Sequence, residues 1–327
     1  MSPPENTKQI SLSRIKSGPL NYVVPIIQYF SSNPHPPHKV RLCSVGISHY
    51  VEKVRWGFTL SGIDYIEDAH TPGLASIATT TIDAETSATP IIKTENGQVV
   101  KMQDSTAILQ KYCPELYPTP EVLEIEEELD KTLGPSARVF AYHHLLKPEH
   151  KNLMSDLATR ETSIIETILF KMMVNRNLIQ PGMKKFMCIS SETALESQSE
   201  IESIFETYSK RLETSPYLAG DAFTAADVTF CALSSPLLSP SQFDDLSADP
   251  ATFPTELIEM REKLRATPAG RHVVRCYNEY RFGRIEKGKV EKGGRKMVQI
   301  LSGKRDRWGV IGLVIAAPLV GFAAMLN

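Results

Sequence analysis

The sequence lacks the closely spaced cysteine pairs that form zinc knuckles and dithiol redox motifs. Its five cysteines are scattered and none belongs to a CxxC pair: Cys43, Cys113, Cys188, Cys231 and Cys276. Such spacing suits a reducing compartment, and we expect most of these thiols in the core as small apolar side chains. The sequence therefore predicts no metal site and no dithiol chemistry.

The sequence also lacks a large excess of positive or negative charge. The formal net charge is -2 over 327 residues, which carries no overall signature of nucleic-acid binding. The hydrophobic content of 42% is enough for a substantial core, and the length allows one large domain or two ordinary ones. We expect no nucleic-acid partner.

Long hydrophobic runs are absent except at one end of the chain. Residues 308–327 carry no charge, and at about 1.5 Å per residue they would span roughly 30 Å of hydrocarbon. Pro318 is tolerated in a membrane helix, and the basic residues before the run favour the cytosolic side. The run predicts a single transmembrane tail anchor with a cytosol-facing body, in an organelle membrane that the sequence does not specify. The alternative is a buried C-terminal helix.

The rest of the chain predicts an α+β body. Proline-rich residues 1–38 are expected to be disordered. Residues 39–115 have the pattern strand, helix, strand, loop, two strands and helix, and residues 116–282 have helical periodicity throughout. The Gly/Lys/Arg-rich residues 283–307 predict a basic linker before the tail. We expect helices at 120–141, 155–174, 192–213, 225–233, 255–265 and 270–280, and solvated histidines at His143, His144 and His150. The segment 71–89 is expected to be loop, with room for one weak helix.

Ser48 stands where the first strand gives way to the first helix, in the stretch "VGISHYVEKVRW". Serine is a preferred helix N-cap, because its hydroxyl satisfies a free amide of the first turn. Taken alone, the residue predicts a cap.

Three separated motifs resemble the glutathione transferase superfamily. "SHYVEKVRW" is similar to the start of the first helix in the serine-type classes. "ATPIIKTENGQVVKMQDSTAIL" resembles the family's Val-Pro, strand, turn, strand, Glu/Asp-Ser and helix sequence. "SPYLAGDAFTAADVTF" is similar to the family's helical-domain segment Leu-x-Gly-Asp-x-Phe-Thr-x-Ala-Asp. The resemblance spans about residues 40–280 and implies a thioredoxin-like N-terminal domain followed by an all-α C-terminal domain, to which the tail adds a single transmembrane helix.

The third motif also has its own physical interpretation. Thr224 is an N-cap candidate, and Asp227 falls at the third helical position, so their reciprocal bonds would form a capping box. Phe223 and Val228 occupy the flanking staple positions. We expect a folding device here rather than a site.

The resemblance implies that glutathione is the co-substrate and that five residues hold it. Ser48 would be catalytic by donating its hydroxyl hydrogen bond to the glutathione thiolate, beside a helix N-terminus. A cis Pro90 would expose the backbone of Thr89 for strand-like pairing with the cysteinyl part. Ser105 would bind the γ-glutamyl carboxylate at a helix start, and Asp104 would accept from the γ-glutamyl ammonium.

Two departures from the family pattern leave alternatives open. His49 replaces the proline that usually follows the serine, and the segment 70–86 lacks the lysine that some classes use on the glycyl carboxylate, for which His70 is a candidate substitute. Ser44 competes with Ser48 as the thiolate partner. Cys43 is nearby, but disulfide chemistry would need cysteine at position 48.

The function that these motifs predict is a membrane-anchored glutathione transferase acting on small apolar electrophiles or peroxides, with a homodimer allowed by the resemblance. The alternatives are a glutathione-binding sensor and a non-catalytic adaptor. The ganglioside-induced differentiation-associated proteins of the mitochondrial outer membrane share the transferase-like body and hydrophobic tail, and a long basic or helical insertion would favour the adaptor.

Overall fold

The computed structural model describes residues 40–82, 88–95, 98–240 and 252–281. Three of the predicted segments, 1–38, 283–307 and 308–327, lie outside these residues. None of the helices within the described residues combines the length and the apolar character that a membrane crossing needs.

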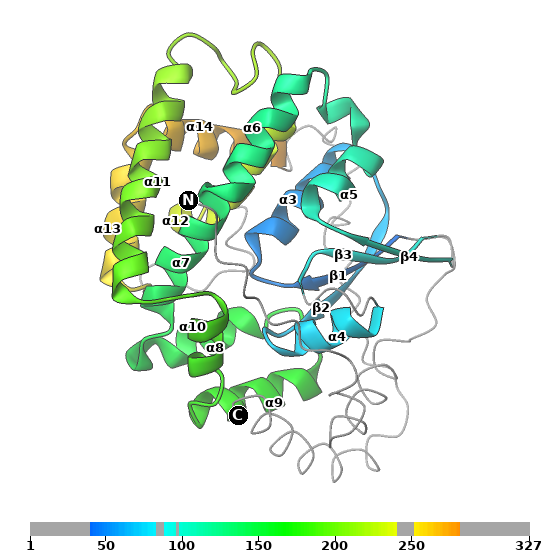
Figure 1. Cartoon of the computed structure of the whole chain (residues 1–327), viewed down its shortest axis with the longest axis vertical. Helices are drawn as coiled ribbons and strands as arrows, with labels where there is room; N and C mark the ends of the chain where they lie inside the picture. Colours follow the sequence, from blue (N-terminus) through cyan, green and yellow to red (C-terminus); the bar gives the residue numbers. More distant parts are fainter. Residues whose placement is uncertain (1–39, 83–87, 96–97, 241–251, 282–327) are drawn as a thin grey trace, which may run out of the picture.

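A mixed four-stranded sheet forms the first half of the described chain (Figure 1). Its strands are β1 (Val40–Val45), β2 (Tyr65–His70), β3 (Ile91–Glu95) and β4 (Gln98–Gln103), in the order β2-β1-β3-β4. β1 is parallel to β2 and antiparallel to β3, and β3 and β4 form the predicted hairpin. A parallel pair needs a crossover, which α3 (His49–Leu60) supplies. The predicted α+β class is confirmed.

Alternate residues of each strand point to opposite faces of the sheet, and helices cover both faces. The remaining helices of this half are α4 (Leu74–Ile82) and α5 (Ser105–Tyr112). Leu42 and Ile92 belong to the main core with α3 and α5, whereas Cys43 and Ile91 pack with Ala78 of α4. The sheet is therefore a rigid platform for the loops at its edges.

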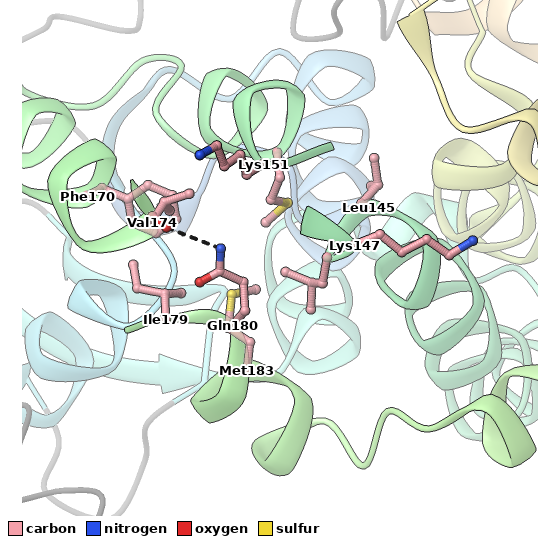
Figure 2. Close-up of a pocket in the computed structure, with 10 residues that line it drawn as sticks. Leu145, Lys147, Lys151, Phe170, Val174, Ile179, Gln180 and Met183 are labelled. Carbon is pink, nitrogen blue, oxygen red and sulfur yellow. Dashed lines mark hydrogen bonds between the residues drawn. The ribbon is translucent and has the colours of Figure 1, made fainter. Parts of the chain in front are cut away.

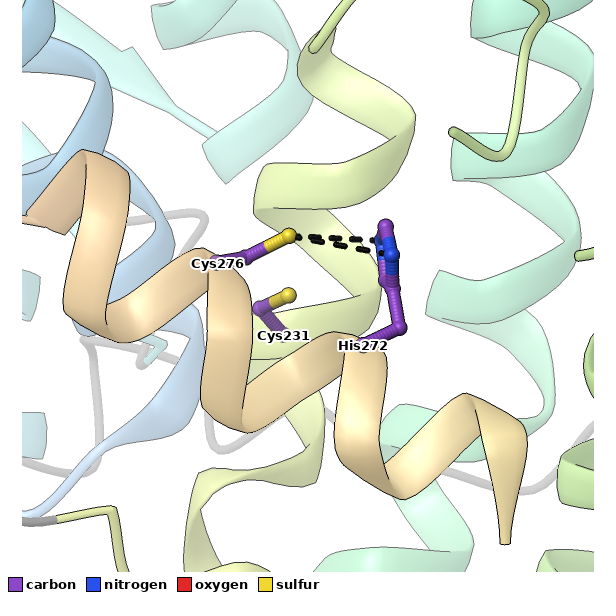
Figure 3. Close-up of side chains that lie close together, drawn as sticks. All are labelled: Cys231, His272 and Cys276. Carbon is purple, nitrogen blue, oxygen red and sulfur yellow. Dashed lines mark hydrogen bonds between the residues drawn. The ribbon is translucent and has the colours of Figure 1, made fainter. Parts of the chain in front are cut away.

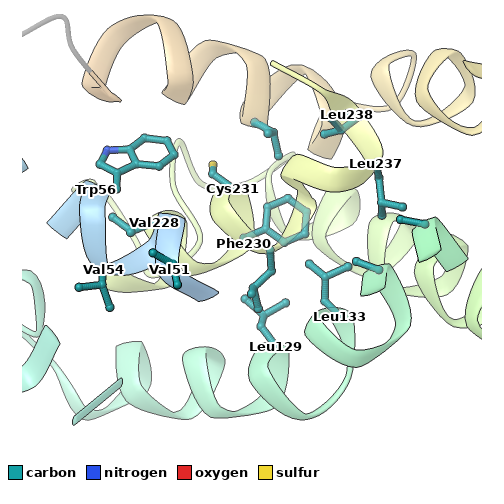
Figure 4. Packing of buried hydrophobic residues seen from close by; sticks show 14 of the residues in the cluster. Val51, Val54, Trp56, Leu129, Leu133, Val228, Phe230, Cys231, Leu237 and Leu238 are labelled. Atoms are coloured by element: carbon teal, nitrogen blue, oxygen red, sulfur yellow. The ribbon is translucent and has the colours of Figure 1, made fainter. Parts of the chain in front are cut away.

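The second half of the described chain is helical, as predicted. Its helices are α6 (Pro120–Lys131), α7 (Leu133–Leu145), α8 (Lys151–Ala158), α9 (Ile164–Asn175), α10 (Gln180–Phe186), α11 (Ser191–Arg211), α12 (Ala225–Leu238), α13 (Thr255–Arg265) and α14 (Pro268–Cys276), followed by a π-helical turn η4 (Tyr277–Arg281). α12 is almost entirely buried and packs against α3, α6 and α7. Figure 4 shows Trp56 and Val54 of α3, Phe230 of α12 and Leu129 of α6 in this shared core. The two halves thus pack through one continuous apolar interior.

The predicted capping box begins α12. Thr224 is the N-cap, and its backbone amide donates to the Asp227 carboxylate at 3.1 Å. The other carboxylate oxygen accepts from the Leu218 amide at 3.0 Å and faces Nε2 of His272 at 2.9 Å. Asp227 therefore satisfies several buried donors besides its own helix, which is a structural role as expected.

The first turn of α3 is bonded to the helical half. Nε2 of the buried His49 lies 3.0 Å from the carbonyl oxygen of Gly134, and the Tyr50 hydroxyl donates to the carbonyl oxygen of Asp130 at 3.1 Å. Burial, and then the positive charge of Arg138, lower the pKa of His49 to about 3, although its bond to Gly134 opposes this. The ring is therefore neutral at pH 7, and its N–H donates to the carbonyl.

Gly134 is required by this close approach, and Gly134→Ala is expected to destabilise the protein by about 1–3 kcal/mol. An added Cβ would lie 2.1 Å from the Tyr50 hydroxyl oxygen and 2.6 Å from the carbon that bears it. Gly182→Ala is the matched control, because no atom lies within 4 Å of its added Cβ, and there alanine is expected to stabilise α10 slightly. Urea unfolding measures the stability of both variants. Equal changes in the free energy of unfolding would contradict the close contact between Gly134 and Tyr50.

Several local predictions were wrong or incomplete. The segment 71–89, expected to be loop with room for one weak helix, contains α4, whose Leu74 and Ala78 are buried against the sheet. Residues 120–141 and 155–174, each expected as one helix, are divided between α6 and α7 and between α8 and α9, and α10 was not expected. Ser163 starts α9 as an N-cap and accepts from the Glu166 amide, so the break has a local cause. In α4, by contrast, burial against the sheet outweighs weak helix propensity.

His144 was expected to be solvated and is instead buried. Its Nδ1 lies 3.3 Å from a carboxylate oxygen of Glu256 on α13. Burial is the largest effect on its pKa, which is lowered despite that carboxylate. The side chain serves the contact between α7 and α13 rather than the solvent face.

Candidate functional site

The strand register gathers the predicted site residues at one edge of the sheet. Cys43 of β1 is opposite Ile91 of β3, and Ile91 is opposite Gln103 of β4. Thus the loop after β1, the segment before β3 and the segment after β4 meet at the same end. These three segments carry Ser48, Thr89 with Pro90, and Asp104 with Ser105. The edge therefore also holds the N-termini of α3 and α5.

Ser48 is the N-cap of α3, and its hydroxyl oxygen accepts from the Val51 amide at 3.4 Å. A hydroxyl has one donor and two acceptor lone pairs, so this bond leaves the O–H free to donate. The residue is half-buried, whereas His49 after it is buried. The cap and the predicted sulfur contact are compatible on one side chain.

The segment before β3 contains a cis peptide bond between Thr89 and Pro90, as the resemblance implied. Pro90 is buried and Thr89 is half-buried. The site roles of both residues remain predictions.

The start of α5 combines an exposed carboxylate with a buried hydroxyl residue. Asp104 is the N-cap, with a φ of 79° that non-glycine residues rarely adopt. Its Oδ1 accepts from the Thr106 amide at 3.1 Å, and Ser105 is buried at the first helical position. Residues held in such backbone conformations cluster at ligand sites, and the free helix amides favour an anion here. The roles of Asp104 and Ser105 also remain predictions.

Neither Ser44 nor Cys43 is open to a ligand. Ser44 is fully buried and donates its hydroxyl to Glu67 of β2. Cys43 is 1% exposed and faces α4. The alternative of Ser44 as the thiolate partner was wrong, because its side chain belongs to the packed interior.

A buried charge network supports the loop that carries Ser48. Arg55 of α3 pairs with Glu67 and donates to the carbonyl oxygen of Gly46 at 3.0 Å. Burial lowers the pKa of Arg55, but the Glu67 carboxylate outweighs it, and the pKa ends above its ordinary value. Arg55 is therefore paired inside the protein. Its partner is 12 residues along the chain on a strand, which no helical spacing could indicate.

His70 does not serve as a free cation for a glycyl carboxylate. It is buried at the end of β2, and its Nδ1 lies 2.7 Å from the Glu166 carboxylate of α9. The other oxygen of Glu166 accepts from the Thr71 amide at 3.1 Å. Burial alone would lower the pKa of His70, but Glu166 and then Cys43 raise it well above its ordinary value. The pair holds α9 against the sheet.

Glu166→Gln is expected to lower the His70 pKa and to destabilise the protein by about 1.5–3 kcal/mol near pH 6. Because the pKa of His70 is higher in the folded protein than in the unfolded chain, the pair contributes its full stabilisation below the unfolded-state pKa of about 6.5. This stabilisation is lost as the pH rises through the folded-state pKa. The difference between parent and variant should therefore shrink in alkaline solution. Urea unfolding at several pH values measures it; a difference that grows with pH would contradict the pair.

A small hollow lies among α7, α8, α9 and α10 (Figure 2). Its wall is mainly apolar, with Phe170, Val174 and Met183, and Gln180 donates to the Val174 carbonyl oxygen at 3.3 Å. None of the predicted site residues lines it. The buried residues of α8 and α9 around it, such as Met154, Phe170 and Val174, belong to the same core as the rest of the helical half.

Residues 165–238 match the family described as Glutathione S-transferase, C-terminal domain. No curated protein matches the sequence.

Among solved structures, the chain is similar to the beta-etherase LigF from Sphingobium sp. strain SYK-6, with 18% identity and a TM-score of 0.45 over 72% of this chain and 99% of that one. It is also similar to glutathione transferase F2 from Populus trichocarpa, with 14% identity and a TM-score of 0.43 over 73% and 99%. A third is glutathione S-transferase-I bound with lactoylglutathione, with 16% identity and a TM-score of 0.43 over 72% and 99%.

Proposed function

We propose that the protein is a glutathione transferase that activates the glutathione thiol through Ser48. The observation that carries this proposal is the convergence of Ser48, Pro90 and Asp104 at one sheet edge, beside two helix N-termini. The match of residues 165–238 to the transferase C-terminal family supports it.

The edge offers each part of the tripeptide a chemical partner. The N-terminal amides of α5 and the residue Ser105 suit the γ-glutamyl carboxylate, and Asp104 suits the ammonium. The backbone before β3 suits the cysteinyl amide as an added strand would. Ser48 then donates to the sulfur at the start of α3, which favours the thiolate that attacks an apolar electrophile or a peroxide. We further propose that residues 308–327 anchor the protein in a membrane with its body facing the cytosol.

A second candidate, a non-catalytic adaptor, is favoured by one observation. Between α7 and α11 lie the short helices α8–α10, which carry exposed apolar side chains at Ile164, Ile168 and Phe186. An adaptor would use such a surface and would leave the sheet edge without a ligand.

Glutathione binding separates the two functions. We expect the full chain to bind glutathione by calorimetry, and Asp104→Asn to weaken binding about tenfold by removing the charge that faces the ammonium. Asparagine keeps an oxygen for the Thr106 amide, so α5 should stay capped. Glu127→Gln, which removes an exposed carboxylate paired with Lys131 on α6, is the matched control and should bind as the parent does.

An absence of binding in a folded protein would support the adaptor. Binding that is equally weak in Asp104→Asn and Glu127→Gln would remove Asp104 from the site.

A further inference from the structure

Arg138 of α7 is a half-buried cation without a counter-ion among the described residues. Its Nε is shielded from solvent and makes no hydrogen bond in the part of the chain that the structure describes. The buried arginines and lysine of the same ranges are all paired with carboxylates: Arg41, Lys53, Arg55 and Arg281. A charge removed from water without a partner is costly, so this exception needs an explanation. A bound anion would supply one.

The contacts between α3 and the helical half place Arg138 beside the start of α3. They run in opposite chain directions and join Lys53 to Glu126, Tyr50 to the Asp130 carbonyl oxygen and His49 to the Gly134 carbonyl oxygen. Arg138 follows Gly134 by four residues and so lies on the same face of α7, one turn further along. This turn of α7 therefore lies beside the end of α3 that Ser48 caps.

The charge of Arg138 acts on this end of α3. Burial and then Arg138 lower the pKa of His49 to about 3. Burial and then Asp130 raise the pKa of Tyr50, and Arg138 opposes them. At pH 7 both rings are therefore uncharged, and neither neutralises the guanidinium. The first turn of α3 thus meets a free positive charge from the helical half.

This position suits the electrophile rather than glutathione. The contacts proposed for the remainder of the tripeptide come from the sheet half, namely the backbone before β3 and the start of α5. Arg138 comes from the helical half and meets the end of α3 at which Ser48 would hold the sulfur. Tyr142, one turn further along the same face of α7, adds a half-buried aromatic ring. A guanidinium beside an aromatic ring suits an aromatic carboxylate.

We propose that Arg138 binds a carboxylate carried by the electrophile, so that acidic apolar electrophiles are the preferred substrates. This inference rests on the proposed function, because it requires the glutathione sulfur to lie at Ser48. The planar guanidinium can bind both carboxylate oxygens and would orient the electrophile toward the sulfur. A neutral electrophile of similar shape would lack this contact and would leave Arg138 unpaired.

A matched pair of aryl chlorides tests the inference in the full chain: 4-chloro-3,5-dinitrobenzoate and its methyl ester. In both reactions the thiolate sulfur forms a bond to the carbon that bears chlorine, chloride leaves, and the thiol proton passes to solvent. After the uncatalysed rates are subtracted, the ratio of kcat/KM for the acid to that for the ester should fall about 10- to 100-fold in Arg138→Met. Arg138→Lys should retain part of the preference, because it keeps the charge but loses the planar fork.

Two controls separate this role from a structural one. Arg176→Met removes an exposed arginine at the end of α9 and should leave the ratio unchanged. Arg138→Met should bind glutathione as the parent does, and its Tm should be equal or higher, because methionine keeps apolar contacts and removes an unpaired charge. Weaker glutathione binding would assign Arg138 to a carboxylate of the tripeptide and would overturn the inference.

Binding of 3,5-dinitrobenzoate, which has no leaving group, keeps the test informative if a variant does not fold. In the presence of glutathione, the unaltered chain should bind this acid at least about tenfold more tightly than its methyl ester by calorimetry. Equal binding of the two overturns the inference. Turnover of both aryl chlorides with equal losses in Arg138→Met overturns the anion site and leaves the proposed function intact. A preference for the acid in binding, without turnover of either aryl chloride, supports the anion site and contradicts the proposed function.

Discussion

Lys53→Met is expected to lower the free energy of unfolding by about 3–5 kcal/mol. Nζ of Lys53 is fully buried, 2.6 Å from Glu126 and 2.7 Å from Asp130, and it donates to the Thr106 hydroxyl at 2.9 Å. Methionine fills similar space but leaves two carboxylates without their cation. Removal of one partner of a buried pair costs far more than loss of a surface pair.

The loss should depend on pH in a defined direction. Burial raises the pKa of Glu126, with Lys53 opposing that rise, and removal of Lys53 raises the pKa further. When the pKa of a carboxyl group is higher in the folded protein than in the unfolded chain, the group contributes its full stabilisation below the unfolded-state pKa of about 4.5. This stabilisation is lost as the pH rises through the folded-state pKa. The difference between parent and Lys53→Met should therefore be larger at pH 7 than near pH 5.

Lys131→Met is the matched control for this prediction. Lys131 is 72% exposed and pairs with Glu127 at 2.9 Å within one helix, so its removal should cost less than about 1 kcal/mol. Urea unfolding of both variants at two pH values gives the comparison. Similar small losses in both would mean that Lys53 is not a buried counter-ion.

The second large effect is expected on catalysis. Ser48→Ala should lower kcat/KM for conjugation of an aryl halide by about 10²- to 10³-fold, the usual cost of removing one donor aimed at developing charge. The loss should fall mainly on the chemical step, because the proposed role of Ser48 is at the sulfur, whereas the proposed contacts to the rest of the tripeptide come from other segments. Ser48→Thr keeps a hydroxyl and should retain most of the activity.

The stability effect of this substitution needs its own control. Ser48 caps α3, and loss of a cap costs about 1 kcal/mol. Ser190 caps α11 by accepting from the Thr193 amide at 3.1 Å, so Ser190→Ala removes a comparable bond elsewhere. Steady-state kinetics on both variants should show the activity loss only at Ser48. Equal activity in the two would leave Ser48 as a cap alone.

The parts of the fold that were predictable depend on local pattern. The β-rich residues of β1, the β3–β4 hairpin, the cap at Ser48 and the box formed by Thr224 and Asp227 all lie within a few residues of chain, where local sequence is informative. The resemblance added the cis bond before Pro90. The position of the candidate site, where the end of β1 meets the start of β3 and the end of β4, could be predicted from the order of these elements.

The remaining features depend on contacts that no local pattern contains. Lys53 pairs with residues more than 70 positions away, and Arg281 pairs with Glu52 across 229 positions. Folding also brings Cys231 beside His272 and Cys276 (Figure 3), which their positions in the sequence do not indicate. The break between α8 and α9, by contrast, has a local signal in the N-cap Ser163, which the prediction of a single helix overlooked.

The ionisation of bound glutathione tests the central claim most directly. Ultraviolet titration of thiolate absorbance in the complex of the full chain should give a thiol pKa below about 7, against about 8.5 for a free cysteine thiol. With Ser48→Ala the value should return most of the way toward that of the free thiol. An unchanged pKa in the parent complex would contradict the proposed role of Ser48.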